Sequence, residues 1–254
     1  MSDILQTQLP YDLAARRPLP GITPMEMATW IHVDEAFAAQ MALRGQLIAD
    51  KRDKVIGLTP EGAAPAAELL QMVLTQLSAR TDYKVSSDQV TRPDGIAVAV
   101  DHADPLATLG QLVQEDLCIM QKQGDEHVLV AAVLCFPSSW TLAQKLGRPL
   151  LAIHVPVEEY DDNIGKRVQR LFDGVRPGRP LWRFNILWYP VATLFHPRRE
   201  FDRRPPEPPE TAPFLRTERQ GILRLPETHA VVFSIHTFVL DGDQARRMMA
   251  GQAD

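Results

Sequence analysis

Residues 231–239 read Val-Val-Phe-Ser-Ile-His-Thr-Phe-Val, without glycine or proline. β-Branched and aromatic residues fill this stretch, as is typical of strands. Side chains of a strand alternate between its two faces. One face receives Phe233, Ile235, Thr237 and Val239, and the other receives Val232, Ser234, His236 and Phe238. The stretch therefore predicts the final strand of the fold.

A second strand is predicted upstream, where residues 128–135 form a continuous apolar run of strand length. Such a continuous apolar run is typical of a central strand, and Pro137 ends it. Further strands are predicted at residues 96–100, 150–155 and 184–188. Helices are predicted after Asp34 and at residues 59–77, 104–120, 138–147 and 161–173. The irregular order of these elements predicts an α+β fold in which helices flank an antiparallel sheet.

Composition excludes several classes of protein. The 254 residues carry a formal net charge of -5, so no global basic field indicates nucleic acid. The longest apolar run, residues 128–136, is too short to span a membrane. The N-terminus lacks an apolar signal region, and Cys118 and Cys135 lie in apolar stretches. We therefore expect a cytoplasmic protein with buried free thiols and no membrane partner.

One folded domain accounts for most of the chain. Residues 1–25 are rich in proline and polar residues and predict an extended arm. The domain spans residues 26–242, and a loop at 197–213 holds six prolines and four arginines. Residues 243–254 form a polar tail, helical or frayed.

Four sequence blocks carry a resemblance to a known family. They are Trp30-Ile-His-Val-Asp34 with Arg44 and Leu47; Gln114-Glu-Asp-Leu117; Cys135-Phe-Pro-Ser-Ser-Trp140 with Lys145-Leu-Gly147 and Ile153-His-Val-Pro-Val157; and Arg216-Thr-Glu-Arg-Gln220 with Leu223-Arg-Leu-Pro226 and residues 231–238. Their order and spacing over residues 20–240 resemble the haem-binding alpha subunit of haem-dependent oxidative N-demethylases. Each block alone is weak, but the last two in combination are specific.

The resemblance implies a PAS-like haem domain that binds b-type haem. Family activity couples dioxygen reduction to the removal of an N-methyl group from a small methylated amine, which releases formaldehyde. Electrons come from NADPH through FMN and an iron–sulfur cluster on separate reductase proteins. No Cys-x-x-Cys-His is present in this sequence, so covalent attachment of haem is not expected.

Haem requires an axial ligand, apolar walls and cations for its propionates. His154 is the expected iron ligand, because Pro156 restricts the backbone after it. The other interpretation is a buried histidine bonded to backbone. Trp140 is expected to wall the haem, or else to pack in the core. Lys145 is an expected propionate partner, and Arg219 and Arg224 are expected to contact a propionate or the substrate. The alternatives are a helix-end cation for Lys145 and a solvated charged turn for the arginines.

His236, Asn185 and Trp188 are candidates for the substrate pocket. The family usually has arginine at the place of His236, so this residue departs from the pattern and could replace His154 as ligand. The other interpretation is a half-buried strand residue. Tyr160 and Asp161 are further candidates for contact with an ammonium group. The remaining histidines are interpreted as surface, loop or turn residues: His32, His102, His127, His196 and His229.

Two other functions stay open at this point. PAS-like haem domains also serve as gas or redox sensors, although residues 241–254 are too short for a signalling coiled coil. A family member could also have lost haem and bind another small molecule. No general base is identifiable from the sequence.

Overall fold

The computed structural model describes residues 3–18, 21–154, 162–200, 202 and 207–251. Within them the strands are β1 (Thr23–Pro24), β2 (Ile56–Leu58), β3 (Lys84–Val85), β4 (Gln89–Thr91), β5 (Ala97–Ala99), β6 (Asp116–Gln123), β7 (Glu126–Val133), β8 (Leu181–Tyr189), β9 (Phe214–Arg224) and β10 (Val231–Asp241). The α-helices are α1 (Phe37–Asp50), α2 (Arg52–Val55), α3 (Ala63–Ser78), α4 (Pro105–Leu112), α5 (Leu142–Lys145), α6 (Leu150–His154), α7 (Asp162–Gly174) and α8 (Gly242–Met249). Short 3-10 helices lie at Leu13–Ala15, Met27–Thr29 and Pro60–Gly62.

A seven-stranded antiparallel sheet forms the centre of the molecule, in the order β1-β8-β9-β10-β6-β7-β2. β10 is its middle strand. It pairs with β9 along its whole length, from Val231 opposite Arg224 to Asp241 opposite Phe214. The alternation at residues 231–239 thus determines which side chains enter each layer of the protein.

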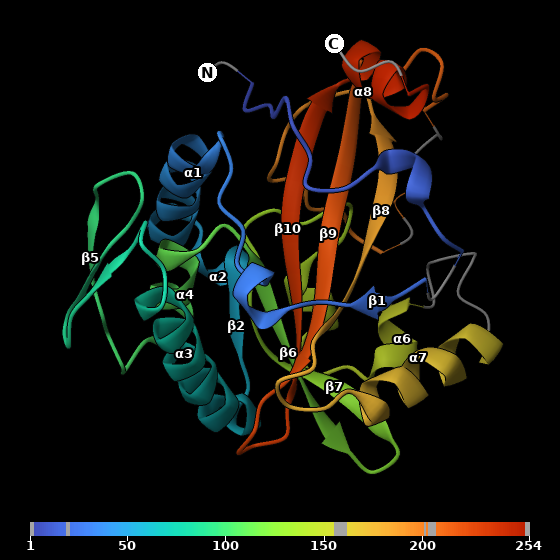
Figure 1. The fold of residues 1–254 in the computed structure, drawn as a ribbon. Coiled ribbons are helices and arrows are strands. Elements are labelled where there is room, and N and C mark those ends of the chain that lie inside the picture. Colours follow the sequence, from blue (N-terminus) through green and yellow to red (C-terminus); the bar gives the residue numbers. More distant parts are fainter. Residues whose placement is uncertain (1–2, 19–20, 155–161, 201, 203–206, 252–254) are drawn as a thin grey trace.

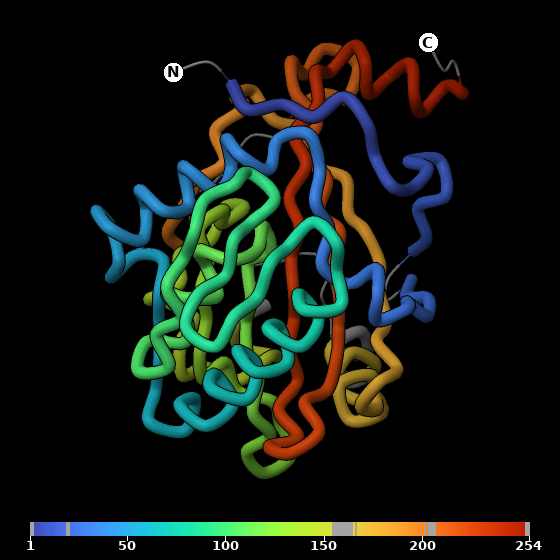
Figure 2. The backbone as a smooth tube through the Cα atoms, turned by 60° about the vertical axis from the view of Figure 1, so that its left-hand side comes forward, coloured from blue at the N-terminus to red at the C-terminus, as the bar shows by residue number. Residues whose placement is uncertain are grey.

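Helices cover both faces of this sheet (Figure 1). We call the face packed against α1, α3 and α4 the α3 face; Leu117, Ile119 and Val232 point to it. The opposite face, the α7 face, packs against α5, α6 and α7 through residues such as Cys118 and Ile222. A small sheet, β3-β4-β5, lies outside α3 and α4 (Figure 2).

This arrangement confirms the α+β class with an antiparallel sheet flanked by helices, while the PAS-like topology stays a prediction. The strands at 128–135 and 231–239 are confirmed, including the two faces of the latter. The described part of residues 197–213 contains no helix or strand, and the tail begins with α8. Within the described residues, no helix has the length and apolarity needed to cross a membrane.

The helix predicted at residues 104–120 is too long. Asp104 and Pro105 start it as expected, with the Asp104 carboxylate accepting from Ala107 N, but α4 ends at Leu112. Asp116 then begins β6, where its carboxylate accepts hydrogen bonds from the backbone N of Cys135 and Phe136 at 2.7 and 2.8 Å. These bonds hold residues 116–120 in the sheet, against their helical apolar spacing.

Candidate functional site

A patch on the α7 face is not fully covered by helices. Phe233 lies on the middle strand β10, opposite Cys118 on β6 and Ile222 on β9, yet its side chain is only partly buried. Arg183, Asn185 and Leu187 of β8 occupy the same face and are also partly buried. A side chain in the middle of a helix-covered sheet is usually fully buried. Incomplete cover over Phe233 therefore leaves surface on which a ligand can pack.

Trp140 borders this patch from the segment that follows β7. Trp140 and Phe233 pack against the same core cluster under α6 and α7. The backbone before Trp140 is sharply turned, because Ser139 has a φ of 63°, a conformation that L residues rarely adopt. The hydroxyls of Ser138 and Ser139 share hydrogen bonds with the Tyr189 hydroxyl, at 2.7 and 3.1 Å. β8 thereby fixes the direction of the segment that carries Trp140.

Lys145 places a buried cation beside Trp140. Its Nζ lies 5.4 Å from the centre of the Trp140 ring and donates to the Ile153 carbonyl at 2.6 Å. Burial lowers the pKa of this ammonium group from its ordinary value. Because α5 ends at Lys145 and α6 ends one residue after Ile153, this bond ties the two short helices together.

The segment carrying His154 is a helix, so the strand predicted at residues 150–155 is wrong. Ile153 N donates to the Pro149 carbonyl at 3.0 Å. Leu150 and Ile153 are buried while Leu151 is 37% exposed, which is the spacing of a helix. The proline at the start and two leucines favour a helical turn over a strand. His154 is the last residue of α6, and its side chain, like Tyr160 and Asp161, lies outside the described residues.

A row of buried polar side chains extends the patch across β8 and β9. Asn185 Nδ2 donates to Glu218 Oε2 at 2.9 Å, and Asn185 Oδ1 accepts from Glu218 N at 2.9 Å. Gln220 Nε2 also donates to Glu218, and Arg216 pairs with it at 3.3 Å. This carboxylate has a fixed orientation, and Asn185 is the partly exposed member of the row.

Arg224 lies on the α7 face, but its guanidinium is bound to backbone carbonyls rather than to the polar row. Its guanidinium donates to the carbonyls of Phe172 and Val175 at 2.6 and 2.7 Å, and to His229 O at 2.8 Å. It therefore anchors the C-terminal end of α7. The interpretation of residues 216–224 as a solvated turn is wrong, since they form β9 and Arg216 is buried.

Three predicted site residues lie on the α3 face instead. Arg219 and His236 are directly opposite each other on β9 and β10, and Trp188 is on β8. Arg219 donates to the Trp30 and Thr29 carbonyls, at 3.0 and 2.9 Å. Arg246 lies 5.6 Å from the centre of the Trp188 ring. The sheet thus separates these residues from Trp140, Lys145, Asn185 and Arg224.

His236 is fully buried between two carboxylates, so its interpretation as half-buried is wrong. Its Nε2 and Nδ1 lie 3.1 Å from Asp34 Oδ2 and from Glu115 Oε1, respectively. Burial favours the neutral ring, but the two hydrogen bonds outweigh it and raise the pKa of His236. His32 packs edge-on at 5.0 Å between ring centres, and burial lowers its pKa to about 4. Three of the sequence blocks supply this cluster: His32 and Asp34 come from the first, Glu115 from the second and His236 from the fourth.

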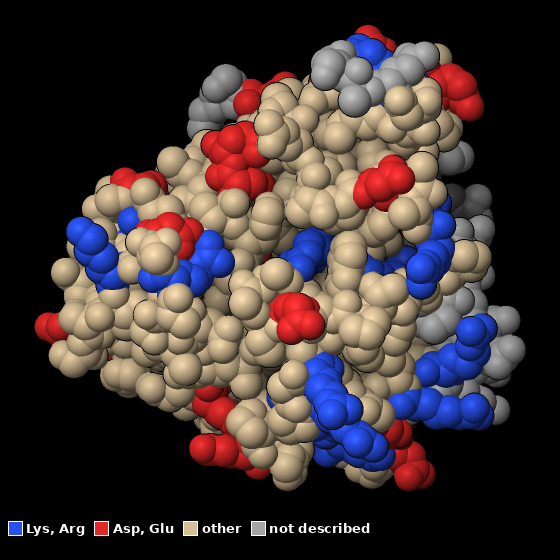
Figure 3. Space-filling view, in the orientation of Figure 1, with Lys and Arg blue, Asp and Glu red and all other residues tan. Residues whose placement is uncertain are grey.

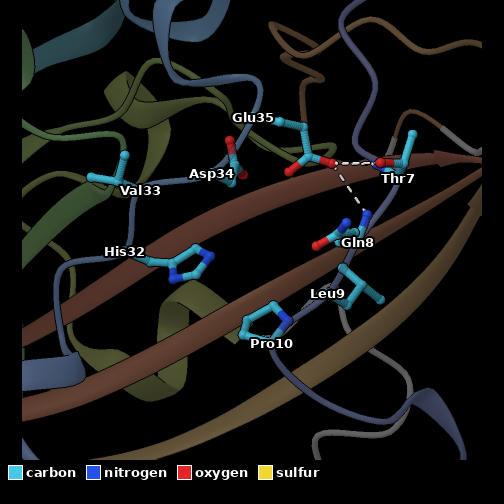
Figure 4. A pocket seen from close by; sticks show the side chains of 8 residues that line it. All are labelled: Thr7, Gln8, Leu9, Pro10, His32, Val33, Asp34 and Glu35. Atoms are coloured by element: carbon cyan, nitrogen blue, oxygen red, sulfur yellow. Dashed lines mark hydrogen bonds between the residues drawn. The ribbon is translucent and has the colours of Figure 1, made fainter. Parts of the chain in front are cut away.

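Beside this cluster is a pocket of about 400 Å³ beneath the N-terminal arm, lined by Thr7, Gln8, Leu9, Pro10, His32, Val33, Asp34 and Glu35 (Figure 4). Glu35 holds the arm in place, since its Oε1 accepts from Thr7 N at 2.6 Å and from Gln8 N at 3.1 Å. Gln6 is fully buried and exchanges hydrogen bonds with the backbone of Val239. The arm thereby occupies the edge of β10 beyond Ile235, where β6 no longer pairs with it.

His127 was interpreted as a surface or turn residue, and this is wrong. It is fully buried under α7, with Nδ1 2.7 Å from Gln169 Nε2 and its ring 5.4 Å from that of Phe172. Its position follows from α7 packing over β7, which the local sequence around His127 does not reveal.

The described residues of the α7 face include several of the chemical groups that a haem site needs. Trp140 and Phe233 offer aromatic surface, Lys145 offers a cation, and α6 ends in a histidine. Among the described residues no group of three or more His, Cys, Asp or Glu could hold a metal ion. A porphyrin supplies its own ring nitrogens to the iron, so a single protein ligand is sufficient. The residues on this face fit the group.

Comparison with known proteins bears on this site. No curated protein matches the sequence significantly. A family model described as haem-dependent oxidative N-demethylase, alpha subunit-like, matches residues 21–252, which include both faces of the sheet and all of α5, α6 and α7. This chain belongs to the family of haem-dependent oxidative N-demethylase alpha subunit-like proteins.

Proposed function

We propose that this protein binds b-type haem without covalent attachment on the α7 face and removes a methyl group from a small methylated amine, with dioxygen as oxidant and formaldehyde as product. Family membership supports the haem and the type of reaction. The incomplete cover over Phe233, beside Trp140 and α6, is the structural observation that carries the location.

Each residue around the patch has a proposed role. His154 is the axial ligand of the iron, and Trp140 packs against the ring. Lys145, already desolvated beside Trp140, pairs with a propionate. Arg224 is a second propionate partner from the same face, through the second hydrogen of Nη1, since Nε and Nη2 bind carbonyls at the end of α7 and the other Nη1 hydrogen binds His229 O. Arg219 is not included, because it lies on the α3 face.

The amine is proposed to bind over Asn185 and Glu218. Asn185 Oδ1 can accept a hydrogen bond from the protonated amine. Glu218, whose carboxylate is already paired with Arg216, fixes the orientation of Asn185. The apolar Leu187 and Phe233 exclude water from the methyl group. His236 and Trp188 have no direct role, since they lie on the other face.

When bound, haem supplies the dioxygen chemistry that oxidises the N-methyl group. The residues of the chain bind and orient the amine and limit access of water. An alpha subunit-like family implies partner subunits. The family resemblance therefore supports a supply of electrons from NADPH through FMN and an iron–sulfur cluster on partner proteins, which we propose to take place in the cytoplasm.

Haem binding and turnover test the proposal separately. Titration of the purified protein with haemin should produce a Soret band. His154→Ala should change that spectrum, whereas the control His102→Ala, at an exposed position, should not. The loaded protein, supplied with reductant, oxygen and dimethylamine or trimethylamine, should release formaldehyde. A fully loaded protein that yields none from a panel of methylated amines would refute the reaction, and a protein that stays colourless would refute the site.

A further inference from the structure

Positive charge is concentrated in the C-terminal part of α7 and in the turn that follows it, although the protein as a whole is acidic. Residues 166–179 contain five Lys and Arg against one acid, Asp173, while the whole chain carries a net charge of -5. Lys122 neutralises Asp173 at 2.6 Å. The four exposed arginines of this segment are Arg167, Arg170, Arg176 and Arg179, which we call the arginine surface. Figure 3 shows Lys and Arg gathered at the lower right, where Figure 1 draws α7.

Hydrogen bonds fix the backbone that carries the arginine surface. Arg224 binds the carbonyls of Phe172 and Val175 at the end of α7. The following turn closes with Arg179 N donating to Arg176 O at 3.1 Å, with Gly178 at a φ of +71°. A pre-organised charged surface loses less conformational entropy on binding than a flexible one.

This surface also lies directly outside the patch proposed to hold haem. The inner side of α7 buries Phe172 in the cluster that contains Leu150 and Ile153 of α6, and Trp140 packs against the same cluster. One layer of helix therefore separates the arginines from the site. Protein partners with opposite charge are attracted to such a surface and associate faster at low salt.

We propose that the arginine surface is the docking site for an electron-donor protein with an acidic surface. This inference rests on the proposed function, because an electron donor would dock here only if a redox centre lies under α7. An acidic protein matches the charge of this surface, and the position of the surface next to the proposed haem site favours an electron donor over other polyanions.

Direct binding tests the inference without requiring haem. The probe is a plant-type [2Fe–2S] ferredoxin, which has an acidic surface, titrated by calorimetry against haem-free and haem-loaded protein. Binding at low salt should weaken by about tenfold or more at about 0.3 M NaCl. Arg167→Glu/Arg170→Glu and Arg176→Glu/Arg179→Glu should each weaken low-salt binding by about tenfold.

The matched control is Lys54→Glu/Lys84→Glu, which changes the net charge equally at exposed positions on α2 and β3. It should alter the affinity by less than about twofold. Circular dichroism should show that all variants are folded. No binding at low salt, or equal weakening by control and arginine variants, would overturn the inference. Failure of the proposed function would appear instead in the haemin titration, as an absence of haem binding. Chemical reduction of the haem-loaded variants by dithionite should be the same as in the wild type, because the substitutions lie outside the haem site.

Discussion

Asp34 and His236 are 202 positions apart in the chain, yet Asp34 Oδ2 lies 3.1 Å from His236 Nε2 inside the α3 face. Glu115 contacts the other ring nitrogen at the same distance, and Gln6 and Gln114 donate to the Asp34 carboxylate. The N-terminal arm, the segments that lead into α1 and β6, and β10 therefore meet in one polar cluster. Burying these charged and polar groups costs desolvation free energy, which their mutual hydrogen bonds offset only while every member of the cluster is present.

His236→Gln should destabilise the protein by about 3 kcal/mol or more, because it leaves two buried carboxylates without a cation. The measurement is urea unfolding near neutral pH. His102→Gln, at an exposed position, serves as the control and should change the unfolding free energy by less than about 0.5 kcal/mol. A loss below about 1 kcal/mol for His236→Gln would show that the ring carries no charge in the folded protein.

The same pair predicts a pH dependence. Burial opposes ionisation of Asp34, but hydrogen bonds from His236, Gln114 and Gln6 lower its pKa to about 2 from 3.8. Its contribution is present above 3.8 and lost as pH falls toward 2. The pKa of His236 is raised, so its contribution is present below 6.5 and lost as pH rises through the folded value.

The stability difference between the wild type and His236→Gln should therefore be largest between pH 3.8 and 6.5 and shrink on both sides. His32 acts in the opposite direction. Its pKa is lowered to about 4 from 6.5, so its contribution is lost as pH falls below 6.5. Urea unfolding of both proteins across this range provides the measurement, and a difference that does not vary with pH would contradict the charged pair.

The sequence predicted those strands and helices whose apolar residues follow one regular pattern along the element. β7 was predicted from its continuous apolar run, and β10 from its β-branched and aromatic residues with alternating faces. β9 was not, because Arg216 and Glu218 look solvated in the sequence. The structure buries both, since Arg216 donates to the carbonyl of Leu194 and pairs with Glu218. Such partners are set by tertiary structure, which a local pattern does not contain.

The candidate site was predicted in part. Trp140, Lys145, Asn185 and Arg224 do share the α7 face, but Arg219, His236 and Trp188 lie across the sheet. Along a strand, neighbours in sequence point to opposite faces, so Arg219 and Glu218 of one motif are separated. The prediction grouped residues that are close in sequence, whereas in the fold only every second residue of a strand lies on the same face.

Lys145→Met should lower haem affinity by about tenfold or more, through loss of one charge-assisted hydrogen bond to a propionate. It should also reduce the unfolding free energy by about 1 kcal/mol, because the Ile153 carbonyl loses its donor. Haemin titration and urea unfolding measure the two effects. Lys54→Met, an exposed control, should change neither. Unchanged haem affinity in a destabilised Lys145→Met protein would limit Lys145 to tying α5 to α6.

Two helical glycines should respond in opposite ways to alanine. At Gly45 in α1 a Cβ would meet no atom within 4 Å, so Gly45→Ala should stabilise the protein by about 0.5–1 kcal/mol through helix propensity. At Gly110 in α4 the Cβ would lie 2.7 Å from both Ile48 Cδ1 and Val133 Cγ2. Overpacking of about 1–3 kcal/mol there exceeds the propensity gain, so Gly110→Ala should destabilise. Urea unfolding of the two variants measures both signs, and stabilisation by Gly110→Ala would mean that α4 can move away from β7.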